Sequence, residues 1–402
     1  MSESDTLPAG GTVTAGFEGV RRAFLEGQAN APGGAQLCVY RHGERVVDLW
    51  AGRDPAGERP YGARTIGVLM SCTKGVVAGA VHMLAERGLV DFDAALARYW
   101  PEFANGAKDE ITVRQALSHQ AGLMGYDPEA GMGAAQLFDF DLSARKLAEM
   151  TPLWPPGGAV YYHFITFGVL AGELIRRVDG RSAGRFIAEE IAGPLGLDFW
   201  IGLPEAEEPR RAPHFDEGPQ IQSEQWRAVL AGAGVDLESR LARAFIATVV
   251  STDAAIALMN TSRAARAAEL PAGNGVGDAR ALAKFYASLI GPVDGIRLIG
   301  EAAMEAARTP QTLGLGPPGE LRKLARGEPQ PFGVGFELPS AVKPMLGAGS
   351  FGHAGAGGRM GFAHPESGVS VGYACNAMLQ SMTTPDPRWI GWTAAVREAI
   401  GL

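Results

Sequence analysis

The sequence has few cysteines, no excess of basic residues and no long apolar run, and each shortage argues against a class of protein. Its three cysteines, Cys38, Cys72 and Cys375, are odd in number and have neither zinc-site nor disulfide-framework spacing. A formal net charge of −8, with no basic tail or basic helix, disfavours nucleic acid and anionic membranes as partners. No run of about 18 apolar residues is found, so no membrane span is expected.

The amino terminus also lacks the features of a secretory leader. Residues 1–16 read MSESDTLPAGGTVTAG, with neither a basic segment nor an apolar core. We therefore expect a cytoplasmic location, while a chain whose leader had been removed would read the same way. Hydrophobic residues make up 46% and charged residues 20%, which is ordinary for a globular protein.

Patterns typical of strands lie at both ends of the chain, and the middle is mostly helical. His42-Gly43 is the predicted turn of a hairpin, and Ser367-Gly368 is the predicted turn between two later strands. The strand-like runs are residues 35–40, 45–50, 332–338, 361–364 and 369–376. Apolar residues at helical spacing are found over residues 14–31, 71–88, 166–178, 185–191, 239–250, 279–290 and 387–402.

These patterns predict a mixed α/β (α+β) fold. An antiparallel sheet is built from both chain ends and covered by helices, because strands from the two ends need a common sheet in which to bury their apolar faces. The 402 residues exceed the usual size of one domain. We expect one discontinuous domain of residues 12–90 and 292–402, a mostly helical domain of residues 91–291, and the active site at their interface.

Two glycine-containing motifs have a structural explanation. Residues 180–184 match G-x-S-x-G, but a helical pattern rather than a strand precedes them, so we interpret Gly180 as a helix C-cap and Ser182 as the next N-cap. Residues 314–319 match G-x-G-x-x-G, but no strand leads in and two prolines remove backbone N–H donors. We interpret this second motif as a loop.

Ser71-Cys72-Thr73-Lys74 opens the apolar helical run and is the strongest chemical signal. Residues three apart share a helix face, so the Ser71 and Lys74 side chains can meet. Free N–H groups at the helix start can stabilise negative charge, and burial favours a neutral amine able to accept the serine proton. A serine N-cap with a nearby lysine is also common, but the apolar run after Lys74 draws the amine into the core, where an ammonium is rarely found.

Two further segments have the residue types that such a site would need. Tyr161 and Tyr162 lie just before the helical pattern at residues 166–178, and a phenol there could share the proton. The glycine-containing stretch at residues 350–376 allows substrate to approach the backbone closely, so that an N–H at a strand edge could complete an oxyanion hole with the N–H of Ser71.

Along the chain an S-x-x-K motif is followed by a tyrosine motif and then by an H-x-G in place of K-T-G. With this order of motifs the chain resembles the serine β-lactamase and D,D-peptidase fold group. Within that group it is most similar to the class C β-lactamase-like family VIII carboxylesterases. The resemblance extends over most of the chain, in the segments ITVRQALSHQAGL, YHFITFGVLAGELIRRV, IGLPEAEEPR, ELPAGNGVGDARALAKFYASL and FGHAGAGGRMGFAHPE.

The resemblance implies a role for each matching residue. Ser71 would be the acylated nucleophile, Lys74 its hydrogen-bonded base partner, and Tyr162, rather than Tyr161, the catalytic tyrosine. His353-Ala354-Gly355 would take the place of K-T-G, with His353 and Gly355 facing substrate, and Ala356 would supply the second oxyanion N–H. Whether Lys74 or a Tyr162 phenolate removes the serine proton stays open, since coupled groups titrate as a unit.

Several positions depart from the β-lactamase pattern. Phe164, two residues after Tyr162, stands where β-lactamases have asparagine, and it is a candidate substrate contact. His353 and Ala354 replace a cation and a hydroxyl that would bind the carboxylate of a β-lactam. Arg359 could supply that charge instead, but we favour a solvent-facing turn arginine. For His163 we favour a packed residue at a helix start over a pocket residue.

The expected function is hydrolysis of small, short-chain carboxylic esters through an acyl-enzyme. The resemblance implies no metal and no organic cofactor, and a small-molecule ester as the partner rather than nucleic acid or a membrane. Alternatives are β-lactam or D-amino-peptide hydrolysis, acyl transfer to an alcohol, and a non-catalytic binding module. The sequence does not indicate the oligomeric state.

Overall fold

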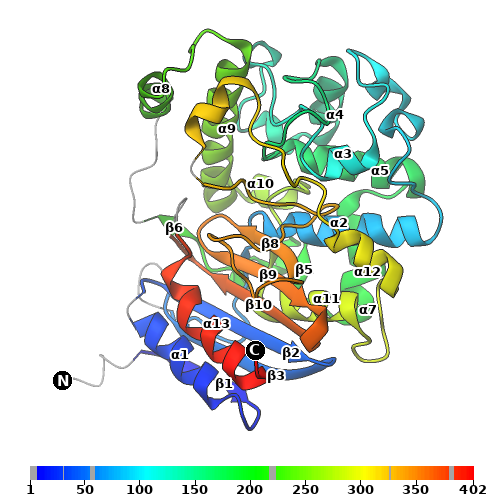
Figure 1. Ribbon diagram of the computed structural model, residues 1–402. Coiled ribbons are helices and arrows are strands. Elements are labelled where there is room, and N and C mark those ends of the chain that lie inside the picture. The colour runs from blue at the N-terminus through cyan, green and yellow to red at the C-terminus, as the bar shows by residue number, and fades with distance from the viewer. Residues whose placement is uncertain (1–6, 30, 55–58, 217–222, 326, 380–383) are drawn as a thin grey trace.

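The computed structural model describes residues 7–29, 31–54, 59–216, 223–325, 327–379 and 384–402. Its central element is a six-stranded antiparallel sheet built from both ends of the chain (Figure 1). In spatial order the strands are β1 (Ala9–Val13), β3 (Glu44–Gly52), β2 (Gly34–Arg41), β10 (Val369–Cys375), β9 (Arg359–His364) and β8 (Phe351–Gly355). β2 pairs with β10 at the centre, where Val39 lies opposite Val371. The predicted sheet is thus confirmed.

Local sequence explains the central strands. His42 and Gly43 have positive φ values of 49° and 80°, as a tight hairpin turn requires, and they join β2 to β3. β10 is buried along its whole length, consistent with its apolar sequence VSVGYAC. Gly372 in β10 allows close packing, because a Cβ there would lie 2.0 Å from the carbonyl oxygen of Ala279.

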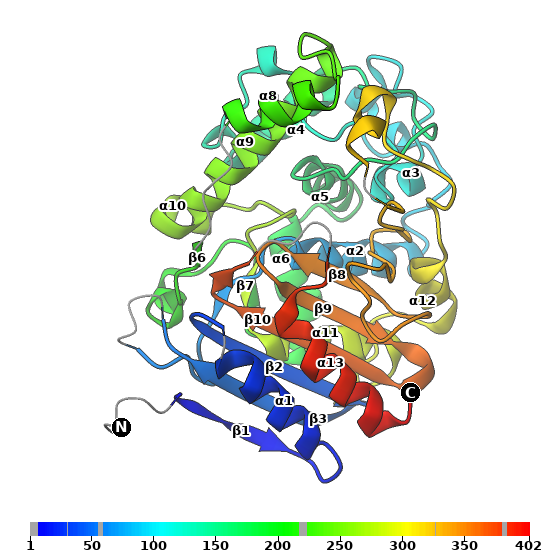
Figure 2. The same cartoon turned by 60° about the vertical axis from the view of Figure 1, so that its left-hand side comes forward.

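Helices cover both faces of this sheet (Figures 1 and 2). α1 (Glu18–Ala29) and α13 (Pro387–Ile400) lie side by side on one face, where Phe24, Trp392 and Val396 join a core cluster with inward-facing residues of the sheet. α11 (Ala279–Ile290) packs on the opposite face, and α2 (Cys72–Glu86) lies next to β8. α2 therefore begins at the edge of the sheet.

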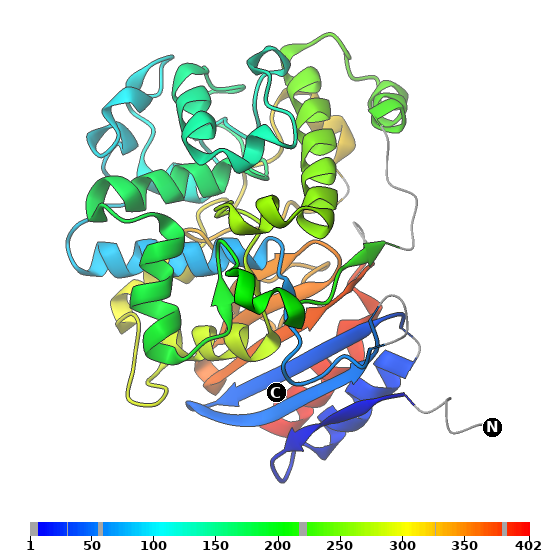
Figure 3. The ribbon, with the colours of Figure 1, turned by 180° about the vertical axis from the view of Figure 1, so that it is seen from behind.

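The remaining helices lie mostly beyond α2, away from the sheet (Figures 2 and 3). They are α3 (Val113–Leu117), α4 (Phe140–Glu149), α5 (Thr166–Asp179), α6 (Ala183–Ile187), α7 (Gly193–Leu195), α8 (Ser223–Gly232), α9 (Arg240–Thr261), α10 (Arg263–Ala267) and α12 (Glu301–Arg308). Two small sheets join distant segments: β4 (Gly67–Val68), β7 (Val276–Gly277) and β5 (Phe199–Trp200) form one, and β11 (Ala377–Met378) and β6 (Phe215–Asp216) form the other.

α9 is longer than the sequence predicted. It continues past Val250 to Thr261, and by length and composition alone it is the one described helix that could cross a membrane. Phe245 and Val249 of α9 pack into an internal cluster with Trp154 and Leu230, and a core helix passes the same compositional test.

Two further expectations can be compared with the structure. Residues 332–338 do not form the predicted strand; Glu337 makes isolated bridges with Phe332 and Gly352, and Gly335, at φ 86°, interrupts the extended backbone. Gly180 adopts the left-handed cap conformation and the Ser182 hydroxyl accepts a hydrogen bond from the N–H of Arg185, as expected for caps. The division into one domain of residues 12–90 with 292–402 and another of residues 91–291 stays a prediction. Because α11 packs on the sheet, we propose that the helical domain ends before α11 rather than at residue 291.

Candidate active site

Ser71 lies immediately before α2, at the edge of the central sheet. Met70 precedes it with φ 52°, a conformation that side-chain-bearing residues rarely adopt and that is often found at functional sites. Gly355 at the end of β8 packs closely here, because a Cβ on it would lie 2.4 Å from the carbonyl oxygen of Leu69. The end of β8 therefore lies against the chain that leads into Ser71.

Lys74 lies one turn into α2 and its side chain is fully buried. Its Nζ donates hydrogen bonds to Ser71 Oγ at 3.1 Å and to the carbonyl oxygen of Ala272 at 2.7 Å. Burial lowers the pKa of Lys74 from 10.5 to about 7; Lys343 acts in the same direction, and Glu337 opposes it. A substantial fraction of this amine is therefore neutral near pH 7.

Tyr162 comes from the loop before α5, and its ring centroid lies 4.9 Å from Lys74 Nζ. Burial and the charge of Glu337 raise the pKa of Tyr162 well above its usual value, against the effect of a hydrogen bond with Ser71. The phenol is therefore protonated at neutral pH. The structure thus brings together Ser71, Lys74 and Tyr162, whereas Tyr161 packs edge-on against Phe245 of α9, with 6.0 Å between ring centroids.

β8 forms another wall of this site through His353. The His353 side chain is buried, and its ring centroid lies 6.0 Å from that of Tyr162. Nδ1 lies 2.7 Å from the carbonyl oxygen of Ala354, while Nε2 is buried with no hydrogen-bond partner among the described residues. Burial lowers the pKa of His353 to about 4, so the imidazole is neutral. Phe164 is half-buried and packs edge-on against Tyr162, with 5.2 Å between ring centroids.

Arg359 is not the solvent-facing arginine that we favoured from the sequence. It lies in β9, its exposed fraction is 1%, and its Nη1 donates a hydrogen bond to the carbonyl oxygen of Ala356 at 2.9 Å. The sequence reading was wrong because the strand pairing of β8 with β9 covers this residue. Ala356 itself is partly exposed, and no internal hydrogen bond in the described part of the chain uses its N–H or that of Ser71.

Two histidines support the loop that holds Tyr162. His163 is buried; its Nδ1 lies 2.7 Å from the carbonyl oxygen of Tyr161 and its Nε2 accepts a hydrogen bond from the N–H of Leu123, so the packed role is confirmed. His119, just after α3, is also buried and has a positive φ of 63°. Its ring centroid lies 4.8 Å from that of Tyr162, and its Nδ1 accepts from the N–H of His163 at 3.0 Å.

Sequence reasoning missed Glu337. The residue is 1% exposed, and its carboxylate accepts a hydrogen bond from the N–H of Ala354 at 2.8 Å and forms an ion pair with Lys343. No motif marks it, but a single acid inside the apolar run FGVGFELP is the kind of residue that is rarely buried without a partner.

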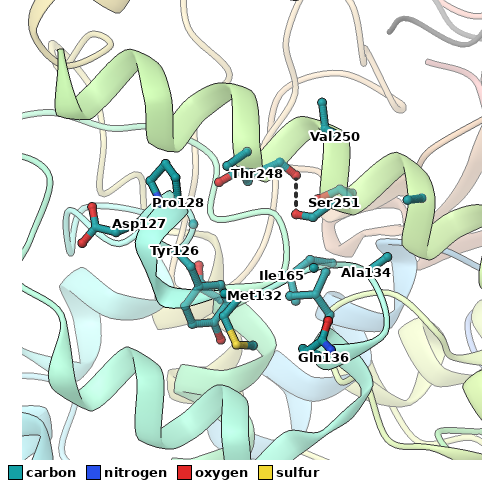
Figure 4. Close-up of a pocket in the computed structure, with 18 of the residues that line it drawn as sticks. Tyr126, Asp127, Pro128, Met132, Ala134, Gln136, Ile165, Thr248, Val250 and Ser251 are labelled. Carbon is teal, nitrogen blue, oxygen red and sulfur yellow. Dashed lines mark hydrogen bonds between the residues drawn. The ribbon is translucent and has the colours of Figure 1, made fainter. Parts of the chain in front are cut away.

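A pocket of about 510 Å³ lies between residues 124–137 and α9 (Figure 4). Tyr126, Met132 and Ile165 form much of its apolar lining, and Thr248 and Ser251 face it from α9. Ile165 and Thr166 follow directly from the Tyr162 loop, so the pocket adjoins that loop. In the described part of the chain, no group of three or more His, Cys, Asp and Glu side chains is placed to hold a metal ion.

The family model for beta-lactamase matches residues 20–390. The chain belongs to the beta-lactamase family. It is 34% identical over 372 residues to the esterase/beta-lactamase LipL of Mycobacterium tuberculosis, an alignment that covers 91% of this chain and 82% of LipL. As a family member related to esterases, it is a serine hydrolase of the esterase type, and the resemblance to family VIII carboxylesterases is confirmed.

Two solved structures align with nearly all of the chain. A penicillin-binding protein homologue from Caulobacter crescentus is 35% identical, with a TM-score of 0.82, and the alignment covers 98% of this chain and 100% of the other. A family VIII carboxylesterase is 34% identical, with a TM-score of 0.81 and the same coverage. The beta-lactamase-like fold predicted from the sequence is therefore confirmed.

Proposed function

We propose that this hydrolase cleaves small, short-chain carboxylic esters through an acyl-enzyme on Ser71. The observation that carries the proposal is the 3.1 Å hydrogen bond from Lys74 Nζ to Ser71 Oγ, with the Tyr162 ring over the same amine. A nucleophile within hydrogen-bond reach of a base, and a third group beside them, is the arrangement that activates a serine.

Lys74 is the proposed base for acylation. With a pKa of about 7 its neutral form is available, whereas burial keeps the Tyr162 phenol protonated. Ser71 Oγ attacks the ester carbonyl carbon while its proton passes to Lys74 Nζ. The N–H groups of Ser71 and Ala356 stabilise the oxyanion.

The leaving alcohol departs on the side of Tyr162. The Tyr162 O–H gives its proton to the alkoxide as the C–O bond breaks, and the Lys74 ammonium returns a proton to the phenolate. Water then attacks the acyl-Ser71 ester; Lys74 takes the water proton, and Ser71 Oγ leaves and is reprotonated. The acid is released and no co-reactant is needed.

β-Lactam hydrolysis is the second candidate, favoured by the name of LipL and by the presence of Arg359. We expect p-nitrophenyl acetate to be cleaved with a kcat/KM about 100-fold or more above that for nitrocefin. The neutral His353 and the methyl group of Ala354 provide no cation for the lactam carboxylate. The Arg359 guanidinium already donates a hydrogen bond to the carbonyl oxygen of Ala356. Both rates are measured on one enzyme sample; comparable values would favour the lactamase.

The pocket in Figure 4 is the proposed site for the alcohol group, because Tyr162 protonates the leaving oxygen and the pocket wall continues from its loop. Ala134→Phe fills part of this pocket. We expect it to lower kcat/KM for benzyl acetate about 10-fold relative to methyl acetate, since a blocked apolar pocket loses the contacts made by the larger group. The measurement is a series of acetates with alcohols of increasing size.

Ala231→Phe in α8 provides the matched control, because Ala231 is exposed and does not line the pocket. It is expected to leave the ratio of benzyl to methyl acetate unchanged. Equal ratios in wild type and Ala134→Phe would place the alcohol group elsewhere.

A further inference from the structure

The buried Glu337 and its ion-pair partner Lys343 lie beside β8, the strand that lines the site. The N–H of Glu337 donates to the carbonyl oxygen of Gly352 at 2.8 Å and the N–H of Gly352 donates back at 3.0 Å, so Glu337 runs along the free edge of the strand. Its carboxylate then reaches the N–H of Ala354, also at 2.8 Å. Without that acceptor, a buried backbone N–H would lose its partner, which costs about 1–3 kcal/mol.

The same carboxylate faces the catalytic centre. Glu337 Oε2 lies 4.0 Å from Nδ1 of His353, whose ring packs near Tyr162. Its other oxygen is held by Lys343, which is about one quarter exposed and so connects the buried carboxylate to solvent. Although burial acts to raise the pKa of Glu337, the charge of Lys343 and the contact with His353 hold it below its usual value.

We infer that Glu337 and Lys343 are positioning residues of the esterase, a role that rests on the proposed function: Glu337 holds β8 in place for the oxyanion N–H of Ala356, and the pair sets the charge that Lys74 experiences. Glu337 alone would favour the ammonium form of Lys74. Burial is the main cause of the lowered pKa of Lys74, and Lys343 acts in the same direction against Glu337, so a neutral, basic amine is available near pH 7.

The other ionisable groups around Lys74 are either neutral near pH 7 or the same in every variant of the test. Glu337 and Lys343 are therefore the charges whose removal can shift the pKa of Lys74. The half-buried Tyr162 before α5, and the buried Cys72 of α2 and Tyr286 of α11, have raised pKa values and are neutral. His119 and His353 have lowered pKa values and are also neutral near pH 7. Among the described residues, Arg359 in β9 is a further cation near this site, since its charge lowers the pKa of Cys72; no variant of the test changes it.

The test uses two charge-removing variants with opposite expected shifts. Glu337→Gln keeps an oxygen to accept from the N–H of Ala354 but removes the negative charge, so the acidic limb of the kcat/KM profile should move down by about one pH unit. Lys343→Gln removes the positive charge, so the limb should move up by about one pH unit. The double variant should return close to the wild-type midpoint. Lys323→Gln, at an exposed site, is the matched control and should not shift.

The Lys74 amine can also be titrated without turnover. The chain has six lysines, so ¹³C-labelled lysine side chains give few NMR signals, and Lys74→Met assigns the one that matters. Shifts of the Lys74 midpoint in the same opposite directions are expected. Equal midpoints in all variants, or both shifts of one sign, would overturn the inference. If these NMR shifts occur but wild-type protein never acylates Ser71, the proposed function fails and the charge coupling stands.

Discussion

Ser71→Ala is expected to lower kcat/KM for p-nitrophenyl acetate by about 10⁴-fold or more. The Lys74 amine at 3.1 Å would then have no hydroxyl to deprotonate, and only the oxyanion donors and substrate binding would remain. Steady-state kinetics measures the loss. Intact-protein mass spectrometry after brief exposure to the ester should show an acyl adduct on wild type and none on Ser71→Ala.

Ser182→Ala is the matched control, since Ser182 is the serine of the G-x-S-x-G sequence. Its hydroxyl accepts from the N–H of Arg185 and donates to Glu269, so it caps α6. The variant should keep both the acyl adduct and kcat/KM, while losing about 1 kcal/mol of stability as capping residues do. Loss of activity in Ser182→Ala, with activity retained in Ser71→Ala, would reverse the assignment of the nucleophile.

Local patterns in the sequence were sufficient for the elements that depend on neighbouring residues. The positive-φ pair His42-Gly43 predicts the hairpin, and α11 begins after Asp278, whose side chain caps it. The S-x-x-K spacing likewise requires only one helical turn to bring Ser71 and Lys74 together. Placing Tyr162 beside them needed the family resemblance, because the 87 residues between Lys74 and Tyr162 carry no local signal of that contact.

Contacts across the fold were not predictable in this way. Arg359 follows two glycines and reads as a turn residue, yet pairing of β9 with β8 buries it against Ala356. Glu337 acts through the N–H of Ala354, a backbone group with no sequence signature. Residues 332–338 alternate as a strand does, but Gly335 adopts a left-handed conformation that interrupts it. For Arg359 and Glu337, contacts with a distant segment decided the role, whereas at residues 332–338 the backbone conformation of one glycine did.

Lys74→Met should abolish turnover, with kcat falling about 10³-fold or more, because the proposed general base is removed. It should also stabilise the protein. The pKa of Lys74 is about 7 in the folded chain, compared with 10.5 for a free lysine. Below about pH 7 folding must therefore bury a charged ammonium, which opposes it. The shift corresponds to about 5 kcal/mol at most, and the unpaired carbonyl of Ala272 offsets about 1–3 kcal/mol of it.

The sign of this stability effect gives a pH test. Below the folded pKa both states carry the ammonium and the cost is complete; as pH rises toward the unfolded pKa, the unfolded state binds more protons and the cost fades. The gain in Tm of Lys74→Met over wild type should therefore be largest near about pH 6.5 and smaller near about pH 9.5.

Lys108→Met is the control for activity, since Lys108 is also buried but donates to the carbonyls of Ala148 and Met150 at the end of α4. It should retain kcat, so that loss of turnover on removing a buried amine is specific to position 74; an active Lys74→Met enzyme would exclude Lys74 as the base.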